Sequence, residues 1–493
     1  MDYILALDQG TSSSKAAIFD QKGLVLGLGQ VEYDNIFPQD GWVEQNPDVL
    51  WDTILAAASE AISQSQIQYN QLSCIGITNQ RETILVWERS TGKCLYNAII
   101  WQDRRTSARC EEIKKLEISN TIKKATGLLI DPYFSATKVQ WILDEVEGAR
   151  AAAKAGDLCF GTVDTYLIWR LTGGSSHLTD ATNASRTLLY DINASAWSNE
   201  LTTFFDIPVS MLPGVCDSAG YFGNALPEFF GKTLPITGVA GDQQAALFGQ
   251  ACFQPGMAKI TFGTGCFAMV NTGNERVNSN HNLLTTIAYQ INGESVYALE
   301  GSIFVAGAAI KWLRDQMRFI ETAAETEKVA IMNNGDAKGV VLVPAFTGLG
   351  APYWSADARG LISGMTLDTS TEDIIIATLQ SIGFQTADLI EAILSDGATI
   401  AEVRVDGGMV SNSWLCQYIS DILGIEVRRP VDTETTILGA AMLAALGHGL
   451  QAGLHDISEV WNLETVFSPQ MVDEERESAL ERWHEALRRT LLD

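Results

Sequence analysis

The residues most able to do chemistry lie at the turn of an N-terminal hairpin, in the stretch YILALDQGTSSSKAAIFD over residues 3–20. An apolar run ends in Asp8, a turn follows through Gly10 and four hydroxyl residues at 11–14, and a second apolar run begins after Lys15. Two apolar runs around a polar turn predict a β-hairpin. Its amides and hydroxyls can bind phosphate oxygens, and Asp8 can hold a Mg²⁺ that the phosphates share. An ordinary polar turn is the alternative.

The pattern recurs in the second half of the chain, where residues 258–271 read AKITFGTGCFAMVN. This is again a strand, a Gly-Thr-Gly turn and a strand. Two hairpins of this type far apart in the chain predict a duplicated architecture, with a nucleotide held between two lobes.

Polar residues also follow two predicted strands. The buried strand 74–78 leads into Asn79–Glu82, and a second strand ends at Trp101. Open α/β folds place their ligand sites just past such strand ends. Arg81, Glu82 and Trp101 offer a donor, an acceptor and a flat apolar surface, which suits a small polyol. A surface ion pair beside a core tryptophan is an equally open alternative.

Composition excludes several classes of function. The 493 residues are enough for two or three domains, and 33 basic against 60 acidic residues give a net charge of -27. We therefore expect no nucleic-acid partner, since such partners need basic faces. We interpret Arg104 and Arg105 as helix-start or surface charges.

No run of 18 apolar residues and no basic, then apolar N-terminus is present, so we expect a cytoplasmic protein without membrane insertion. The eight cysteines form no C-x-x-C pair, which predicts reduced packing residues. No two of the five histidines lie within helical reach, so a histidine metal site is not expected.

Several helices are predicted from periodicity and composition. Residues 301–312 form a Gly/Ala-rich helix start, and the small residues of 438–446 predict a helix that packs closely against a partner helix. At the C-terminus, residues 474–492 have one apolar face, which predicts an amphipathic helix.

Several segments together resemble the FGGY family of carbohydrate kinases, in matching order from Asp8 to about Gly447. They are NQRE at 79–82, WQDRR at 101–105, DPYFSATKVQWILDE at 131–145, DATNASRT at 180–187, GDQQAALFGQ at 241–250 and VDGG at 405–408. NQRE and WQDRR are similar in particular to members that phosphorylate glycerol.

The resemblance implies the fold class and the domains. It implies an α/β protein of two actin-like ATPase (ribonuclease H-like) domains with an interdomain cleft. Residues 1–249 would form the N-terminal domain with most of the glycerol site, and residues 250–493 the C-terminal domain with most of the nucleotide site.

The resemblance also implies the roles of residues around the acceptor. The residues that would line the glycerol pocket are Arg81, Glu82, Trp101, Tyr133, Asp242, Gln243 and Phe267. Asp242 would be the catalytic base, because an alcohol is a weak nucleophile until a carboxylate accepts its proton. Taken alone, Asp242 is also consistent with a helix N-cap.

For the nucleotide, the resemblance implies that ATP binds with Mg²⁺ held by Asp8 and Asp242. The residues that would contact ATP are Thr11, Ser12, Ser13, Lys15, Thr264, Gly307, Lys311, Gly408 and Asn412. Lys15 and Lys311 depart from relatives that have Arg and Gln there. A lysine keeps a donor but lacks the fixed planar geometry, so these departures bear on nucleotide affinity.

The activity that the resemblance implies is ATP-dependent phosphorylation of glycerol to glycerol 3-phosphate, the entry to glycerol catabolism. Its partners would be glycerol and ATP, and the chain would form a homo-oligomer, a dimer or tetramer. One alternative is an FGGY kinase for another sugar or polyol. The other is an actin-like ATPase scaffold without kinase activity, which would not need Arg81, Glu82 and Trp101.

Overall fold

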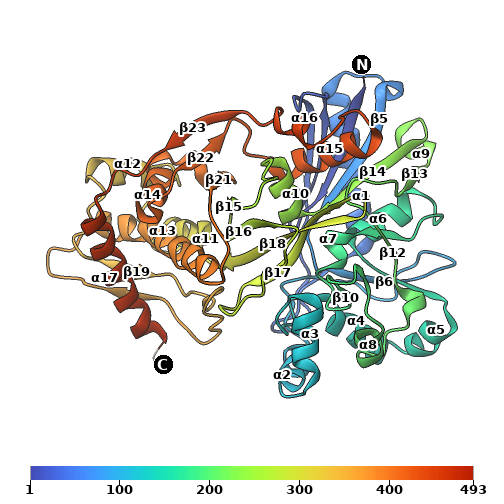
Figure 1. Ribbon diagram of the computed structural model, residues 1–493, viewed down its shortest axis with the longest axis horizontal. Helices are drawn as coiled ribbons and strands as arrows, with labels where there is room; N and C mark the ends of the chain where they lie inside the picture. Colours follow the sequence, from blue (N-terminus) through green and yellow to red (C-terminus); the bar gives the residue numbers. More distant parts are fainter. Residues whose placement is uncertain (1, 492–493) are drawn as a thin grey trace. The chain divides into compact units, whose positions relative to one another are not determined.

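The computed structural model describes residues 2–491, which form two compact units (Figure 1). The first unit consists of Met1–Ala251, Thr285–Tyr297 and Thr435–Trp461, and the second of Cys252–Leu284, Ala298–Glu434 and Asn462–Asp493. The predicted boundary after residue 249 lies close to the first crossing of the chain at 251. Residues 285–297 and 435–461 also belong to the first unit, so a single boundary does not separate the two units. The interdomain cleft stays a prediction.

The first unit is built on a six-stranded sheet in the order β13-β14-β5-β1-β2-β3. Its strands are β1 (Tyr3–Gln9), β2 (Ser13–Phe19), β3 (Val25–Glu32), β5 (Leu72–Asn79), β13 (Gly223–Ala225) and β14 (Leu234–Gly241). β1 and β2 are antiparallel, which confirms the predicted hairpin. Because β1, β5 and β14 run parallel, their carboxyl ends lie at one edge of the sheet.

Two helices, α1 (Pro47–Ser65) and α15 (Thr435–His448), cover opposite faces of this sheet. Successive strand side chains point to opposite faces. Leu5 belongs to the core cluster that contains the buried face of α1. On the other face, a Cβ at Gly76 would lie 2.2 Å from the carbonyl oxygen of Ala440, so only glycine lets α15 approach this closely.

The other elements of the first unit surround this sheet. A four-stranded sheet has the order β4-β7-β6-β8, and two small sheets pair β10 with β11 and β12 with β9. These strands are β4 (Glu44–Gln45), β6 (Ile84–Glu88), β7 (Ala98–Ile99), β8 (Leu158–Thr162), β9 (Leu178–Asp180), β10 (Tyr190–Asp191), β11 (Ala196–Trp197) and β12 (Gly214–Cys216). The helices are α2 (Ser107–Lys114), α3 (Ile118–Thr126), α4 (Ser135–Glu145), α5 (Ala149–Ala155), α6 (Val163–Leu171), α7 (Ala181–Ala184), α8 (Asn199–Phe204), α9 (Pro227–Phe230), α10 (Asp242–Gly249) and α16 (Leu454–Ser458), with short turns η1 (Tyr69–Gln71) and η2 (Val209–Met211).

The second large sheet has the order β17-β18-β16-β15-β21-β22-β23. Its strands are β15 (Met257–Phe262), β16 (Cys266–Gly273), β17 (Leu284–Ile291), β18 (Glu294–Ile303), β21 (Glu402–Asp406), β22 (Val427–Pro430) and β23 (Leu463–Phe467). The antiparallel pair β15 and β16 is followed by the parallel strands β21 and β22. The first sheet has the same arrangement in β1, β2, β5 and β14, so the predicted duplication is confirmed.

The helices of the second unit pack around this sheet. They are α11 (Gly307–Asp315), α12 (Glu325–Met332), α13 (Thr371–Ser395), α14 (Ser413–Leu423) and α17 (Asp473–Leu491), with the turn η3 (Gly408–Ser411) and the strand pair β19 (Val341–Val343) and β20 (Leu361–Ser363). The predicted helix start at 301 is wrong, because residues 301–303 still belong to β18. Gly301 packs against Leu389 of α13, where a Cβ would come within 2.1 Å of a methyl group. Gly301 therefore lies in a strand, where the absence of a side chain allows α13 to pack against it.

The C-terminal helix α17 confirms the predicted amphipathic segment, although the prediction's last residue, 492, lies outside the described residues. Trp483 and Leu487 on its apolar face are buried in the second unit, in a cluster with Phe384 of α13 and Tyr418 of α14. The packing that the sequence predicted is therefore satisfied within the chain.

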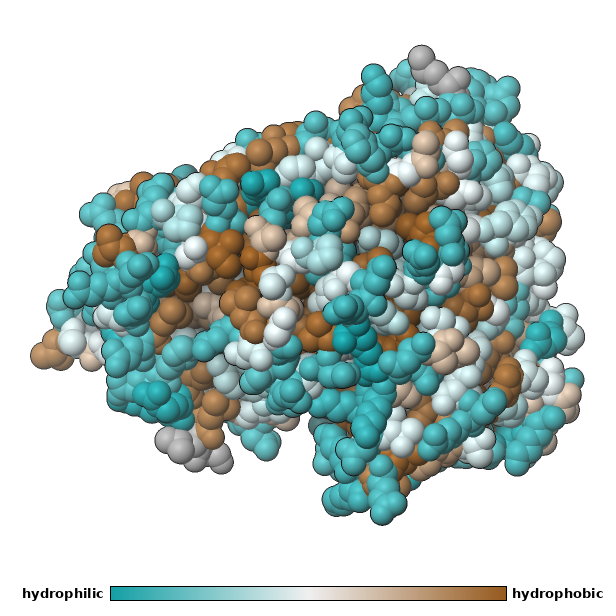
Figure 2. Space-filling model, in the orientation of Figure 1, coloured by the Kyte–Doolittle hydropathy of each residue, from teal (hydrophilic) through white to brown (hydrophobic). Residues whose placement is uncertain are grey.

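The remaining surface and thiol features agree with the composition. All eight cysteines are free thiols, as predicted. Hydrophilic residues cover much of the visible face, with apolar patches between them (Figure 2). Among the described residues, no helix has the length and apolar character needed to span a membrane.

The predicted close packing of the small-residue helix is confirmed within the first unit. A Cβ at Gly439 of α15 would lie 1.8 Å from the carbonyl oxygen of Ala245 in α10. The two helix backbones are therefore in contact, and α15 helps to set the position of α10.

We predict that Gly439→Ala destabilises the protein by about 1–3 kcal/mol, because the added methyl group has no space. The helix preference for alanine, about 1 kcal/mol, acts in the opposite direction and is outweighed. Urea unfolding measures the difference. Gly453→Ala is the control, since its Cβ would meet nothing within 4 Å. Equal stability of the two variants would contradict the close contact.

Candidate functional site

The predicted site residues of the first unit lie at the carboxyl edge of the parallel strands. In the registers of the sheet, Asp8 of β1 stands opposite Thr78 of β5, and Asn79 stands opposite Gly241 of β14. Asp242 follows directly as the first residue of α10. The chain thus brings Asp8, the segment after β5 and Asp242 to the same edge.

The tip of the first hairpin is held by hydrogen bonds from three directions. The indole Nε1 of Trp101 donates to Thr11 Oγ1 at 2.9 Å, and Gln45 Nε2 donates to the Thr11 carbonyl at 2.7 Å. Tyr33 donates its hydroxyl to the Gly10 carbonyl. Ser12 at the tip is exposed. The tip is therefore fixed in place while its outer surface stays accessible.

Four charged side chains form a balanced cluster beside this edge. Arg81 Nε lies 3.1 Å from Asp242 Oδ1, and Arg186 Nε lies 2.5 Å from Glu82 Oε1. The side chains of Arg81, Glu82 and Arg186 are at most 2% exposed, whereas Asp242 is 31% exposed. Two positive and two negative charges offset one another, so only the Asp242 carboxylate faces solvent to a substantial extent.

The backbone at Glu82 has an unusual conformation. Its φ of 63° is in the left-handed region, which costs a non-glycine residue on the order of 1–2 kcal/mol. The turn is held by a hydrogen bond from the Thr83 amide to the Arg81 carbonyl, 2.8 Å, and by Ser135 Oγ, which donates to the Glu82 carbonyl at 3.2 Å. Local strain at a buried charged residue is typical of functional sites.

Aromatic rings form an apolar wall beside the charges. Trp101 and Tyr133 meet edge to face, with ring centroids 5.6 Å apart, and the Arg186 guanidinium lies 5.9 Å from the Tyr133 ring. Behind them, Lys138 Nζ donates to the Tyr133 carbonyl at 2.8 Å. Burial lowers the pKa of Lys138 to about 7. A small molecule with several hydroxyl groups and a short carbon chain matches this combination of charges and rings.

Gln243 and Phe267 complete the residues predicted around the acceptor. Gln243 follows Asp242, is buried, and donates its amide to Asp242 Oδ1 at 2.7 Å. Phe267 is half-buried on β16 of the second unit. Its approach to an acceptor bound by the first unit stays a prediction.

The segment 180–187 positions several of these residues, a role that its sequence alone does not predict. Thr182 Oγ1 accepts a hydrogen bond from the Gly241 amide at 2.9 Å, just before Asp242. Asn183 exchanges hydrogen bonds with Asn79, and Arg186 binds Glu82. The motif DATNASRT was visible in the sequence, but its distance along the chain from residues 79–82 and 241 hid these contacts.

Asp180 anchors this segment as the N-cap of α7. It accepts hydrogen bonds from the Thr182 and Asn183 amides and from Ser218 Oγ. Burial raises the pKa of Asp180. Its role is therefore to orient α7 from inside the protein.

The interpretation of Arg105 as a surface or helix-start charge is wrong. Its side chain is fully buried, 2.7 Å from Glu44 and 2.8 Å from Asp103, and its guanidinium lies 3.9 Å from the Trp42 ring and 4.5 Å from the Trp141 ring. Apart from Asp103, the groups that enclose it come from residues 42–44 and 141, so the sequence next to Arg105 gave no indication of burial.

The interpretation of Arg104 as a surface charge holds. Its side chain is 49% exposed and pairs with Asp131 at 2.6 Å.

The predicted nucleotide residues of the second unit line one cavity of about 620 Å³. These residues are Thr264, Gly307, Lys311, Gly408 and Asn412. Apolar side chains such as Ile310, Met409 and Leu415 form part of the same lining. A cavity of this size with an apolar wall and a few polar groups suits a flat ligand of nucleoside size.

Backbone contacts join the second hairpin to the start of α11. The amides of Ala306 and Ala308 both donate to the Thr264 carbonyl at 3.0 Å. A Cβ at Gly307 would lie 2.5 Å from the Gly263 carbonyl oxygen, so glycine is needed for this approach. Thr264 itself is exposed at the hairpin tip.

Asn412 has a structural role in the cavity wall. Its Oδ1 accepts a hydrogen bond from the Leu415 amide at 2.8 Å and caps α14. Its predicted contact with a nucleotide base stays a prediction, and any such contact would have to come from an amide group that already caps a helix.

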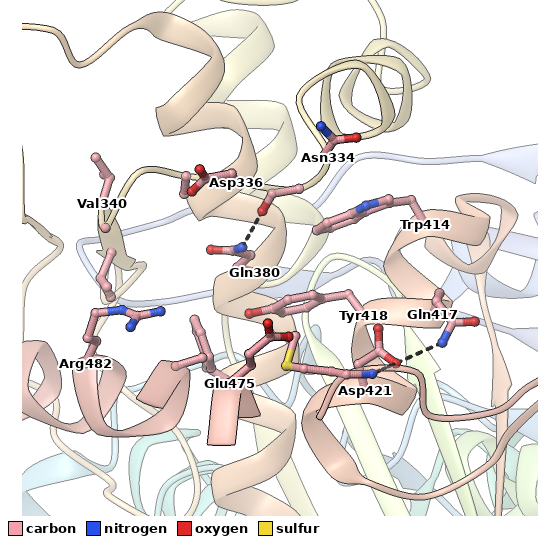
Figure 3. Close-up of a pocket in the computed structure, with 17 residues that line it drawn as sticks. Asn334, Asp336, Val340, Gln380, Trp414, Gln417, Tyr418, Asp421, Glu475 and Arg482 are labelled. Atoms are coloured by element: carbon pink, nitrogen blue, oxygen red, sulfur yellow. Dashed lines mark hydrogen bonds between the residues drawn. The ribbon is translucent and has the colours of Figure 1, made fainter. Parts of the chain in front are cut away.

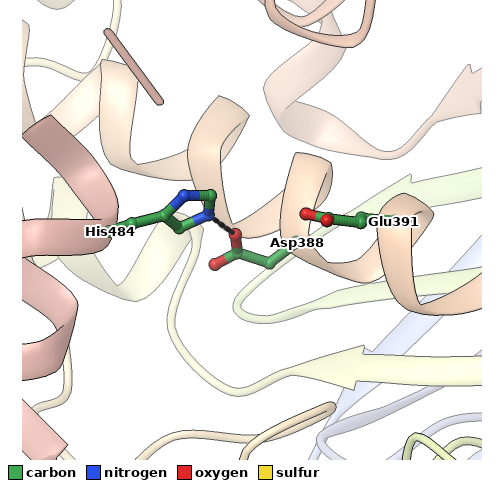
Figure 4. A group of neighbouring side chains, drawn as sticks. All are labelled: Asp388, Glu391 and His484. Carbon is green, nitrogen blue, oxygen red and sulfur yellow. Dashed lines mark hydrogen bonds and ion pairs between the residues drawn. The ribbon is translucent and has the colours of Figure 1, made fainter. Parts of the chain in front are cut away.

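A cluster of Asp388, Glu391 and His484 has ligand atoms within metal-binding distance of one another (Figure 4). However, Asp388 already accepts hydrogen bonds from Trp483 Nε1 at 2.8 Å and from His484 Nε2 at 3.0 Å. Both of its oxygens serve to fasten α17 onto α13. We therefore interpret the cluster as a structural contact.

Comparisons with known proteins agree over the whole chain. Residues 3–249 match the N-terminal domain of the FGGY family of carbohydrate kinases, and residues 258–448 match its C-terminal domain. Glycerol kinases from Alteromonas mediterranea and Alcanivorax borkumensis are each 53% identical, over 99% of this chain and 99% and 98% of their own. The crystal structure of Plasmodium falciparum glycerol kinase with ADP is 36% identical, with a TM-score of 0.94 over 100% of this chain and 99% of its own.

We predict that Arg105→Lys destabilises the protein by about 1–3 kcal/mol, because lysine cannot bind two carboxylates in a fixed plane or stack between indoles. Chemical denaturation followed by tryptophan fluorescence measures the change. The neighbouring Arg104→Lys is the control, since that side chain is half exposed, and should change stability little. Similar losses in both variants would contradict a special role for the buried arginine.

Proposed function

This chain belongs to the FGGY family of carbohydrate kinases, and we propose that it transfers the γ-phosphoryl group of ATP to glycerol, forming glycerol 3-phosphate and ADP. The observation that carries the proposal is the contact of Arg81 with Asp242, 3.1 Å, within a cluster that also contains Glu82. This contact places Arg81 and Glu82, which can bind hydroxyl groups, beside the Asp242 carboxylate, which can accept a proton. The similarity to proteins named glycerol kinase supports the same acceptor.

Glycerol would bind with its hydroxyls toward the charges and its carbons toward the rings. Arg81 donates hydrogen bonds and Glu82 accepts them, so together they can fix two neighbouring hydroxyl groups. Trp101 and Tyr133 offer the apolar wall that the carbon chain needs. Because Arg81 and Glu82 are buried and already oriented by their partners, little ordering would be required on binding.

Asp242 would act as the general base. Its carboxylate is the accessible member of the cluster, and Arg81 and the Gln243 amide hold it in one orientation. It would accept the proton of the attacking hydroxyl as the oxygen–phosphorus bond forms and the bond to ADP breaks. An aspartate fixed in this way contributes by position as well as by basicity.

Each unit carries residues that would bind the nucleotide. The hydroxyl-rich tip with Thr11, Ser12, Ser13 and Lys15 supplies phosphate donors, and the cavity with Lys311 and Asn412 suits the nucleoside. Asp8 and Asp242 would hold Mg²⁺, since both are carboxylates at one edge of the sheet and oxygen is the ligand that Mg²⁺ prefers. When bound, Mg²⁺ neutralises charge on the phosphates.

We expect the purified chain to release ADP from MgATP only when glycerol is present, and Asp242→Asn to lower the rate by about 10²–10⁴-fold. A coupled assay of ADP release measures both, with ketoses, sugar acids and other polyols as alternative acceptors. A higher kcat/KM for one of these would identify another kinase of the family, and release without any acceptor would indicate an ATPase. Near-normal turnover by Asp242→Asn would exclude it as the base.

We also expect Glu82→Gln to raise the KM for glycerol by the equivalent of about 1–3 kcal/mol, with little change in the KM for ATP. The variant leaves Arg186 with a neutral partner, so its unfolding should be measured alongside. Glu60→Gln, on an exposed position of α1, is the matched control. Equal losses for both substrates would indicate a structural role for Glu82.

A further inference from the structure

A chain of buried hydrogen bonds supports the charge cluster from inside the first unit. Its members are Gln244 of α10, Thr286 of β17 and Ser185 at the end of α7. All three side chains are fully buried, and all three residues belong to the first unit. The proposed phosphoryl transfer gives no role to Gln244 or Thr286.

Gln244 contacts Arg81 directly. The Nη1 of Arg81 donates to Gln244 Oε1 at 3.2 Å, while the Nε of the same guanidinium lies 3.1 Å from Asp242 Oδ1. Contacts at two nitrogens fix the plane of a guanidinium as well as its position. The fit is close, because a Cβ at Gly241 would lie 2.6 Å from Arg81 Cγ and 3.1 Å from Gln244 Oε1. Gln244 therefore helps to set the plane in which Arg81 presents its donors.

The other partners of Gln244 determine which way its side-chain amide faces. Its Nε2 lies 3.3 Å from the Ile287 carbonyl oxygen and 3.3 Å from Thr286 Oγ1. A carbonyl oxygen can only accept, so the amide nitrogen must face Ile287 and the amide oxygen must face Arg81. Residues of β17 thus set the orientation of the group that holds the arginine.

The hydroxyl groups continue this chain in one direction. Ser185 Oγ donates to the Thr182 carbonyl at 2.7 Å, which uses its single proton. Ser185 Oγ must therefore accept from Thr286 Oγ1, 3.0 Å away, and Thr286 Oγ1 in turn accepts from Gln244 Nε2. Reversing any of these bonds would leave a buried polar group without a partner, which folded proteins avoid. The polarity of the chain is therefore fixed from α7 to Arg81.

We propose that Gln244 and Thr286 are positioning residues that hold Arg81 in the orientation that binds the acceptor. The proposal rests on the proposed kinase activity, in which Arg81 binds a hydroxyl group of that acceptor. Gln244 is a neutral group, so it holds the guanidinium without changing the balance of two positive and two negative charges in the cluster. Both residues act through Arg81.

The test compares two substitutions at Thr286. Thr286→Val keeps the shape of the side chain and removes the hydroxyl, whereas Thr286→Ser keeps the hydroxyl and removes a methyl group. We expect Thr286→Val to raise the KM for glycerol about fivefold or more, with little change in the KM for ATP, and Thr286→Ser to stay close to the parent. A packing role would give the opposite order, since serine leaves a cavity. That order, or an unchanged KM in Thr286→Val, would overturn the proposal.

A substitution at Gln244 tests the contact with Arg81 itself. Gln244→Met removes the acceptor at similar length, and we expect it to lower kcat/KM for glycerol about tenfold or more. Thr165→Val is the matched control, because Thr165 is also fully buried and its hydroxyl has no hydrogen-bond partner among the described residues. An equal loss in Thr165→Val would overturn the proposal. If Gln244→Met failed to fold, the two Thr286 variants would still decide.

The parent protein separates failure of this proposal from failure of the proposed function. A parent that prefers another polyol overturns glycerol as the acceptor, and the same variants are then compared with that polyol. Release of ADP without any acceptor overturns both proposals. Glycerol kinase activity in the parent, with the same KM for glycerol in Thr286→Val and Gln244→Met, overturns only the positioning role.

Discussion

The charge cluster of Arg81, Glu82, Arg186 and Asp242 is the interaction on which the proposed acceptor site depends. A charge removed from water is tolerated only when partners surround it, and here two positive groups offset two negative ones. The same contacts orient the Asp242 carboxylate and the side chain of Glu82. Any change in one member leaves another without its partner, so the four side chains act as a single unit. Their arrangement depends in turn on α7, whose residues also fix Gly241 and Asn79.

The two large sheets have the same strand arrangement, but different hydrogen bonds hold their hairpin tips. In both, a hairpin lies beside a parallel strand, and the tip of the hairpin projects from the carboxyl edge. The first tip is held by side chains, those of Gln45, Trp101 and Tyr33. The second is held by backbone amides at the start of α11. The side-chain contacts join the first tip to the aromatic wall through Trp101, whereas the backbone contacts bring Gly307 against the second tip, where Thr264 and Gly307 both line the neighbouring cavity.

Helix α14 divides its residues between two tasks in the second unit. Asn412 and Leu415 at its beginning line the cavity assigned to the nucleotide, and Trp414 and Tyr418 line a second cavity, of about 430 Å³, between α13, α14 and α17 (Figure 3). The C-terminal helix closes that second cavity while its Trp483 is fastened to Asp388 of α13. The amphipathic helix α17 thus packs its apolar face on the second unit and also contributes Glu475 and Arg482 to the lining of this cavity.

The sequence by itself determined the features that follow from local patterns. Apolar runs around glycine turns predicted both hairpins, and small residues predicted the close packing of α15. The position of Arg81, Glu82 and Trp101 after strand ends predicts that they neighbour a ligand, which stays a prediction. The family resemblance supplied the pairing of these residues with Asp242 and the list around the nucleotide, of which the second unit gathers Thr264, Gly307, Lys311, Gly408 and Asn412 around one cavity.

Only the tertiary structure decided which charges are buried and what orients them. Nothing near Arg105 in the chain indicates that Glu44, Trp42 and Trp141 enclose it, and Arg186 reaches Glu82 across more than a hundred residues. The return of residues 285–297 and 435–461 to the first unit likewise has no local signal. The physical reason is that periodicity and turn chemistry act between neighbours in the chain, whereas desolvation of a charge depends on everything packed around it.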